Sequence, residues 1–262
     1  MTITPGNYFV DVIESVSVKD IKRKGSETMS NFSAHWKAVL AEFISTLFLV
    51  FLGCMACVPL AGYSTQPALY GPFGFGLVVL FNIQAFGHIS GAHMNPAVTL
   101  GAVIWGKVSI LLGIAYAIAQ CSGAIIGYGI LMTVSPLDLV PEAVCTTQPH
   151  PQHTMIQAVA VEVILTAALN FLNCAVWDPA NEASLESVSM KFGFTIAGLS
   201  IAGGELTGAS MNPARSLGPV VWTGMWETHW VYWVGPLIGG SLSTLFYKLI
   251  WLNKGNHKTE ES

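Results

Sequence analysis

Long apolar stretches separated by short polar ones dominate this sequence. Six of them approach the roughly 20 residues that a helix needs to cross the hydrocarbon core of a bilayer. They are roughly Val39 to Leu60, Ala68 to Phe86, Ile110 to Val134, Met155 to Trp177, Ser189 to Gly203, and Trp230 to Leu252. The fifth is short as written, so we expect it to begin earlier or to tilt. The pattern predicts an all-α membrane protein with six transmembrane helices.

Two further apolar stretches are too short to cross a bilayer. They run from Met94 to about Trp105 and from Met211 to about Trp222. Twelve helical residues cover about 18 Å, against a hydrocarbon core of about 30 Å. In each stretch Asn-Pro follows the Met, and asparagine caps a helix well while proline suits its first turn. The sequence therefore predicts two re-entrant half-helices.

The chain contains an internal repeat. Gly91–Ala97 returns as Gly208–Ala214, with six of seven positions identical. Further matched pairs lie 116 to 120 residues apart: Glu42 and Glu162, Tyr116 and Tyr232, and Gly123 and Gly239. Each copy holds three spans, an odd number, so the second copy must be inverted in the membrane. Inversion brings the two half-helix N-termini together near the midplane, where we expect the non-helical loops Gly87 to Met94 and Gly204 to Met211 to line a pore.

Composition and charge agree with a membrane location. Charged residues make up 10% of the chain, against about 25% in globular proteins. With a cytoplasmic N-terminus, every Lys and Arg except Arg215 falls on the cytoplasmic side, as the positive-inside rule requires. We therefore expect a channel domain at 35–252, with repeats at about 35–134 and 155–252, between cytoplasmic tails at 1–34 and 253–262. The plasma membrane is the default location, and no cleavable signal is expected.

The remaining chemistry is sparse. The cysteines, Cys54, Cys57, Cys121, Cys145 and Cys174, form no disulfide framework, since four lie inside apolar stretches and Cys145 stands alone in a loop. Cys54 and Cys57 form a CxxC inside an apolar helix, and we interpret them as packed thiols rather than as a metal or redox site. No nucleophile–base pair, metal cluster or basic surface for nucleic acid is evident. We therefore expect no enzyme activity, no cofactor and no nucleic-acid partner.

The two asparagines of the half-helices are the first pore candidates. Asn95 and Asn212 would face each other, each offering two N–H donors while its oxygen caps a helix. Water that accepts from both cannot relay protons, and the two helix dipoles repel cations. The alternative is that both residues only cap their half-helices.

Arg215 is a further candidate, because an intramembrane arginine is usually functional. The alternative for Arg215 is a buried structural ion pair with Glu205.

Four other polar residues have two interpretations each. Glu42 and Glu162 either accept hydrogen bonds from the loop backbones or couple proton transport, and their matched positions favour the first. His88 and His93 either line an inner vestibule or satisfy loop backbone.

Several motifs together resemble the aquaporin family, also called major intrinsic proteins, over about residues 35–252. They are the boxes Asn95-Pro96-Ala97 and Asn212-Pro213-Ala214, the run from His88 to His93, Ala214-Arg215-Ser216, Ala41-Glu42-Phe43, Ala119-Gln120-Cys121, and Gly235-Pro236. The resemblance implies an hourglass pore in every subunit of a homotetramer embedded in the lipid bilayer.

The resemblance also implies a selectivity filter at Phe75, Ser200, Ala209 and Arg215. Strict water channels usually have histidine at the Ser200 position and often cysteine at the Ala209 position, so small residues here widen the filter enough for a three-carbon polyol. Glycerol channels carry aspartate where this chain has Ser216. The combination resembles the insect entomoglyceroporins and implies passive flow of water, glycerol and urea.

Three alternatives to a water and glycerol channel are open. A water-selective channel is possible if Ser200 holds an ordered water. An inverted-repeat transporter would couple to protons through Glu42 or Glu162, and its flux would saturate and depend on pH. A structural or adhesive membrane protein would conduct little, although small filter residues argue against a blocked pore.

Overall fold

The computed structural model describes residues 18–59 and 68–252, and these residues are helices and connecting turns without a strand. The long helices are α2 (Val18–Met55), α3 (Tyr70–Ser90), α5 (Ile110–Val134), α6 (Met155–Trp177), α7 (Val188–Thr207) and α9 (Val231–Ile250). The short ones are α4 (Pro96–Trp105), α8 (Pro213–Thr223) and the 3₁₀ helix η1 (Pro179–Ser187). The predicted fold class, six long helices with two half-helices, is confirmed.

Four of these helices are long and apolar enough to cross a membrane, namely His35–Met55 within α2, α3, α5 and α6. Residues from Ala38 onward form one compact unit, and those up to Lys37 form another. The backbone of α2 begins at Val18, well inside the segment expected as the 1–34 tail. Leu60 and the tail at 253–262 lie outside the described residues.

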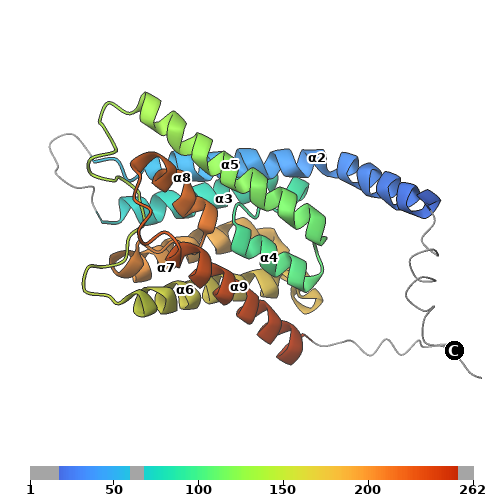
Figure 1. Ribbon diagram of the computed structural model, residues 1–262. Coiled ribbons are helices and arrows are strands. Elements are labelled where there is room, and N and C mark those ends of the chain that lie inside the picture. Colours follow the sequence, from blue (N-terminus) through green and yellow to red (C-terminus); the bar gives the residue numbers. More distant parts are fainter. Residues whose placement is uncertain (1–17, 60–67, 253–262) are drawn as a thin grey trace, which may run out of the picture. The chain divides into compact units, whose positions relative to one another are not determined.

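Within the large unit, the helices group by repeat. Figure 1 shows α2, α3 and α5 of the first repeat together, and α6, α7 and α9 of the second together. The half-helices join the two groups, because α4 packs against α9 as well as α5, and α8 packs against α5 as well as α9. The repeats also meet directly along α3 and α7.

Both half-helices end at a glycine, and a lysine also binds the C-terminal end of α4. Gly106 and Gly224 end α4 and α8 with φ of 96° and 76°, a left-handed conformation that glycine adopts without steric penalty. Lys248 of α9 donates hydrogen bonds to the last carbonyls of α4, at 2.8 Å from Ile104 and 2.9 Å from Trp105. A cation is favourable at the negative end of a helix dipole, so Lys248 ties the end of α4 to the second repeat.

Two helices end later than predicted. We expected non-helical loops from Gly87 and from Gly204, but α3 continues to Ser90 and α7 to Thr207. Glycine inside a helix is only mildly unfavourable, and each helix ends at the next glycine, Gly91 or Gly208, where φ is left-handed. The irregular segments at the centre are therefore only about five residues long.

We expect Gly239→Ala to destabilise the fold. A Cβ at this position on α9 would overlap the carbonyl oxygen of Val163 on α6, and its repeat mate Gly123 meets Phe43 in the same way. Overpacking of this kind costs about 1–3 kcal/mol, which thermal unfolding in detergent would detect as a lower midpoint. Gly198→Ala is the matched control, because a Cβ there has no neighbour within 4 Å. Equal midpoints for the two variants would contradict the close packing of α6 and α9.

Candidate functional site

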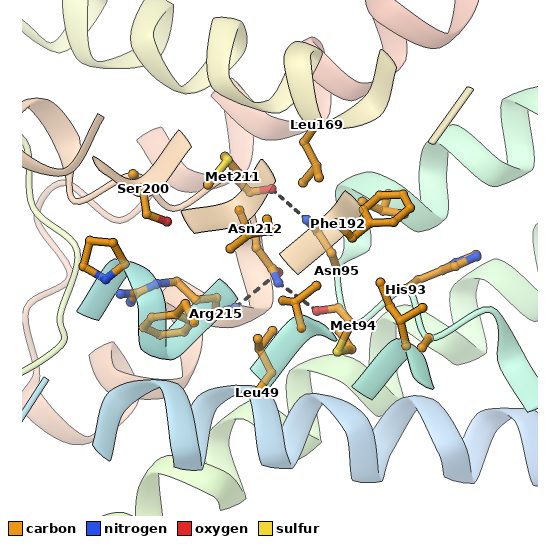
Figure 2. A pocket seen from close by; sticks show the side chains of 18 of the residues that line it. Leu49, His93, Met94, Asn95, Leu169, Phe192, Ser200, Met211, Asn212 and Arg215 are labelled. Carbon is orange, nitrogen blue, oxygen red and sulfur yellow. Dashed lines mark hydrogen bonds between the residues drawn. The ribbon is translucent and has the colours of Figure 1, made fainter. Parts of the chain in front are cut away.

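A cavity of about 820 Å³ runs through the centre of the large unit. Eight of the predicted pore and vestibule residues line it: His88, His93, Asn95, Asn212, Phe75, Ser200, Ala209 and Arg215. The two prolines and two alanines of the boxes, Pro96, Ala97, Pro213 and Ala214, are buried at the starts of α4 and α8. Figure 2 shows the two asparagines between His93 on one side and Ser200 and Arg215 on the other. The cavity therefore connects the predicted vestibule, centre and filter.

The central asparagines cap their own half-helices and also reach across to the other repeat. The Asn95 oxygen accepts from Ala97 N–H, and the Asn212 oxygen accepts from Ala214 N–H. Asn95 Nδ2 donates to the Met211 carbonyl at 2.8 Å, and Asn212 Nδ2 donates to the Met94 carbonyl at 2.7 Å (Figure 2). The expectation of two free donors per asparagine is therefore wrong, because each amide keeps one N–H for the cavity.

The backbone before each cap is held in an unusual conformation. Ala92 and Met94 have φ of 47° and 53°, and their repeat mates Ala209 and Met211 have φ of 45° and 54°. A left-handed residue other than glycine costs about 1–2 kcal/mol, so such segments persist only where their surroundings fix them.

In the first repeat, the fixing group is Glu42, which is fully buried. Its Oε1 accepts from the His93 N–H at 2.8 Å and the Ser90 hydroxyl at 2.6 Å. Its Oε2 accepts from the Met94 N–H and from Gln120 Nε2, both at 2.8 Å. Both carboxylate oxygens are thus occupied by the loop and its neighbours.

Glu162 has the same arrangement in the second repeat and is equally buried. Its Oε1 accepts from the Thr207 hydroxyl at 2.7 Å and the Ser210 N–H at 2.9 Å. Its Oε2 accepts from the Met211 N–H at 2.7 Å. Thr207 and Ser90 were missed from the sequence, although the repeat aligns these two hydroxyls and could have revealed them.

The filter residues meet at one end of the cavity. The Arg215 guanidinium lies 4.6 Å from the centre of the Phe75 ring, a distance at which a cation is attracted to an aromatic face. Its Nη1 donates to the Cys145 carbonyl at 2.7 Å. In the part of the chain that the structure describes, Arg215 makes this hydrogen bond and no ion pair with Glu205.

A chain of three hydroxyls lies behind the filter. Ser216 Oγ is 2.6 Å from both Ser210 Oγ and Thr147 Oγ1. Ser216 is fully buried and does not line the cavity. This position, where glycerol channels carry aspartate, therefore contacts the supporting loops.

The two histidines lie at the opposite end of the cavity from Arg215. His93 Nδ1 is 3.1 Å from Thr99 Oγ1, and its ring lies edge-on to Tyr116. His88 is exposed. The His93 ring also lies 6.4 Å from that of Trp177 on α6, so His93 contacts side chains of both repeats.

The interpretation of Cys54 as a packed thiol is wrong. Cys54 of α2 and Cys145 of the loop between α5 and α6 form a disulfide, with their Cα atoms 5.4 Å apart. The other three, Cys57, Cys121 and Cys174, are free. The two bonded residues are 91 positions apart, and a pairing depends on backbone geometry that spacing alone does not give. Among residues 18–59 and 68–252, no three His, Cys, Asp or Glu side chains gather as a metal site.

Comparisons with known proteins agree on one family. The family model for the major intrinsic protein matches residues 28–247. Aquaporin-4 of Mus musculus is 42% identical over 222 residues, covering 83% of this chain and 68% of that protein. The lens fiber major intrinsic protein of Lithobates pipiens is 42% identical over 219 residues, covering 82% and 81%. The X-ray structure of the aquaglyceroporin from Plasmodium falciparum superposes with a TM-score of 0.72 at 25% identity, covering 82% of this chain and 96% of that one.

Proposed function

Because this chain belongs to the major intrinsic protein family of membrane channels, we propose that it conducts water, glycerol and urea passively and excludes protons and ions. Family membership makes it a channel rather than an enzyme. The relatives include proteins named aquaporin and a structure named aquaglyceroporin. We therefore infer the solute range from the residues of the filter.

The observation that carries the proposal is the small size of two of the four filter side chains. Ser200 and Ala209 border the cavity with one hydroxymethyl and one methyl group, at the end where Arg215 lies. Phe75 adds an apolar wall and Arg215 adds N–H donors. A polyol needs this combination, because its carbon chain favours the apolar wall while its hydroxyls bond the guanidinium. Ser216 stands at the position where glycerol channels carry aspartate. Because Ser216 is buried and does not line the cavity, this difference does not change the groups that a solute would contact.

Exclusion of protons and cations is assigned to the centre and the filter together. Each asparagine presents one N–H to the single file of water, and the positive ends of α4 and α8 meet there. A water that accepts hydrogen bonds from both asparagines is oriented so that it cannot relay a proton along the file. Arg215 adds a full positive charge.

For Glu42 and Glu162 we propose loop support. Both are fully buried, their oxygens are occupied by loop donors, and neither lines the cavity. A proton-coupling carboxylate needs access to the transported ions, so this geometry disfavours the transporter alternative. His88 and His93 are proposed to line the inner vestibule.

We also propose a homotetramer in the plasma membrane with both termini cytoplasmic, as the placement of Lys and Arg favours. A stripe of exposed apolar residues on α5, Ile110, Ile114 and Ile118, is between 54% and 72% exposed in the single chain. Such a stripe suits lipid or a neighbouring subunit.

Stopped-flow light scattering on proteoliposomes tests the proposal. We expect fast volume changes both after an osmotic step and in an isosmotic glycerol gradient. In Ser200→His, the imidazole fills the widened side of the filter, so glycerol flux should fall by about tenfold or more, which corresponds to a barrier of about 1.4 kcal/mol. Water flux should persist.

Ser200→Ala separates width from polarity, because it removes the hydroxyl without adding bulk; glycerol flux should survive in it. Fast water flux without glycerol flux in the wild type would reject the glycerol proposal. The chain would then be a water-selective channel in which Ser200 orders a water.

A further inference from the structure

We propose that the Cys54–Cys145 disulfide is a positioning element of the selectivity filter. It fixes the backbone carbonyl that holds Arg215, and thereby sets the ratio in which uncharged solutes and water pass. The statement about solute ratio rests on the function proposed above, whereas the positioning of Arg215 does not. Neither cysteine contacts the solute path through its side chain, so the effect passes through the Cys145 backbone.

The link from the disulfide to the filter is short. The Cys145 carbonyl accepts the hydrogen bond from Arg215 Nη1 at 2.7 Å. The guanidinium also lies over the face of Phe75, a contact that does not fix its rotation. A hydrogen bond with a charged donor is worth about 1.5–3 kcal/mol. The orientation of Arg215 therefore depends on where one loop carbonyl points.

That carbonyl belongs to a backbone segment that would not keep its shape alone. Cys145 has φ of 65°, and Ala143 has φ of 45°. For residues other than glycine this conformation costs about 1–2 kcal/mol each. If Cys145 returned to an extended conformation, its peptide plane would turn and its carbonyl would leave the guanidinium.

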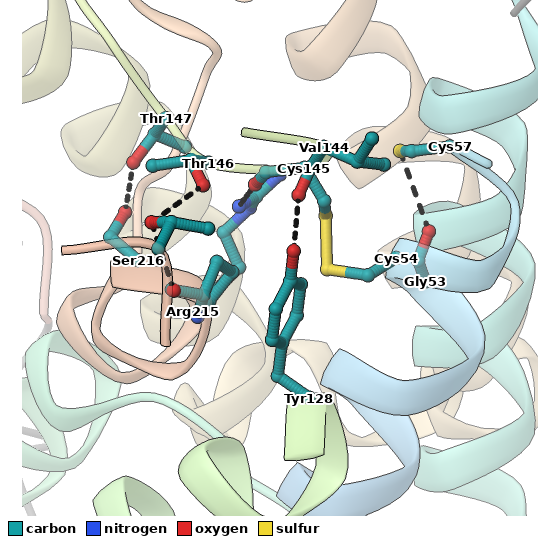
Figure 3. The surroundings of a disulfide bond; sticks show 12 residues. Gly53, Cys54, Cys57, Tyr128, Val144, Cys145, Thr146, Thr147, Arg215 and Ser216 are labelled. Atoms are coloured by element: carbon teal, nitrogen blue, oxygen red, sulfur yellow. Dashed lines mark hydrogen bonds between the residues drawn. A yellow bond between two sulfur atoms is a disulfide. The ribbon is translucent and has the colours of Figure 1, made fainter. Parts of the chain in front are cut away.

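Several tethers hold the segment, among them a contact of 3.3 Å between the Thr146 and Thr223 hydroxyls, and the disulfide is the covalent one. Figure 3 shows the S–S bond joining Cys145 to Cys54 on α2. On one side of Cys145, the Tyr128 hydroxyl donates to the Val144 carbonyl at 2.8 Å. On the other side, Thr147 Oγ1 is 2.6 Å from Ser216 Oγ. Of these tethers, the disulfide acts on Cys145 itself, and the others act on its neighbours.

The anchor on α2 is rigid. Cys54 is fully buried. In the proposed topology this end of α2 faces outside the cell, where disulfides persist. Without the bond, the guanidinium is free to turn into the cavity beside Ser200 and Ala209. The wider solute then loses more permeability than water does.

Two perturbations break the bond independently. The first is the variant Cys54→Ser/Cys145→Ser. The second is dithiothreitol on folded wild-type channels in proteoliposomes; its two thiols become a cyclic disulfide, and two electrons and two protons pass to the protein as the thiols of Cys54 and Cys145. The wild-type experiment stands even if the variant folds poorly. Mass spectrometry after alkylation shows whether the bond was broken.

Two measurements distinguish a change in the position of Arg215 from a change in solute conduction. The chain contains two arginines, Arg23 and Arg215, so a small arginine-specific dicarbonyl reagent can report Arg215 with Arg23 as internal reference. We expect the labelling of Arg215 relative to Arg23 to rise at least about threefold on reduction, because one charged hydrogen bond is lost. The glycerol-to-water permeability ratio should fall by about threefold or more, and the urea-to-water ratio should fall less.

Cys121→Ser keeps the disulfide and must respond to dithiothreitol like the wild type, whereas the double serine variant must not respond further. Unchanged Arg215 labelling after proven reduction would overturn the proposal, as would unchanged solute ratios in a glycerol-conducting channel. If the wild type passes no glycerol, the proposed function fails instead, and Arg215 labelling alone decides whether the disulfide positions the filter.

Discussion

Glu162→Gln is expected to destabilise the folded channel by about 2–4 kcal/mol, because the substitution takes an acceptor away from buried donors that have no other acceptor among the described residues. The carboxylate accepts from the Ser210 N–H and the Thr207 hydroxyl through one oxygen, and from the Met211 N–H through the other. A carboxamide has one acceptor oxygen, so an NH₂ group must face at least one of these donors. Each buried donor left unpaired costs about 1–3 kcal/mol. Thermal unfolding in detergent would show the loss as a lower midpoint.

Glu227→Gln is the matched control, because Glu227 lies exposed in the turn before α9. Glu42→Gln should lower the midpoint by a similar amount, because its two oxygens accept from four donors. A Glu162→Gln channel that unfolds at the wild-type temperature would show that the left-handed loops are fixed by the asparagine caps alone.

The features that the sequence predicted are those encoded by local patterns or by the repeat. The lengths of apolar stretches predicted the long helices, and Asn-Pro predicted the starts of α4 and α8. The repeat predicted that the half-helices meet, since inversion leaves no other place for their N-termini. Arg215 stood out because charge is rare within apolar segments.

The ends of α3 and α7 depended on which glycine stops each helix. Gly87 and Gly204 continue the helix, whereas Gly91 and Gly208 take a left-handed φ. Glu42 and Glu162 favour the later stop, because the backbone N–H groups that they accept from, such as those of His93 and Ser210, follow the second glycine of each pair. These contacts form between distant parts of the chain, so the periodicity of apolar residues along a helix does not reveal them.

The loop behind the filter could not be predicted at all. Cys145 and Thr147 lie in an irregular segment without a repeat mate, and both contact residues 69 to 91 positions away. Their partners are known only after α2, α5 and α8 are packed. The asparagine amides illustrate the same limit, because their cross-repeat bonds to Met94 and Met211 depend on how closely the two caps approach.

Arg215→Ala is expected to raise the leak of monovalent cations by about a hundredfold relative to water flux. Arg215 is 8% exposed and lines the cavity beside Phe75, so a cation that passes comes within a few ångströms of a fixed positive charge. At about 5 Å and an effective dielectric constant of about 20, the repulsion is roughly 3 kcal/mol.

Ion-sensitive and pH-sensitive dyes trapped in proteoliposomes measure this leak while light scattering measures water. Arg215→Lys is the informative companion, because it keeps the charge but loses the planar fork that bonds the Cys145 carbonyl. We expect the Arg215→Lys channel still to exclude cations, while its glycerol-to-water and urea-to-water permeability ratios change. This result would separate exclusion by charge from selection by geometry. If Arg215→Ala excludes cations as well as the wild type does, the barrier lies instead at Asn95 and Asn212, where the positive ends of α4 and α8 meet.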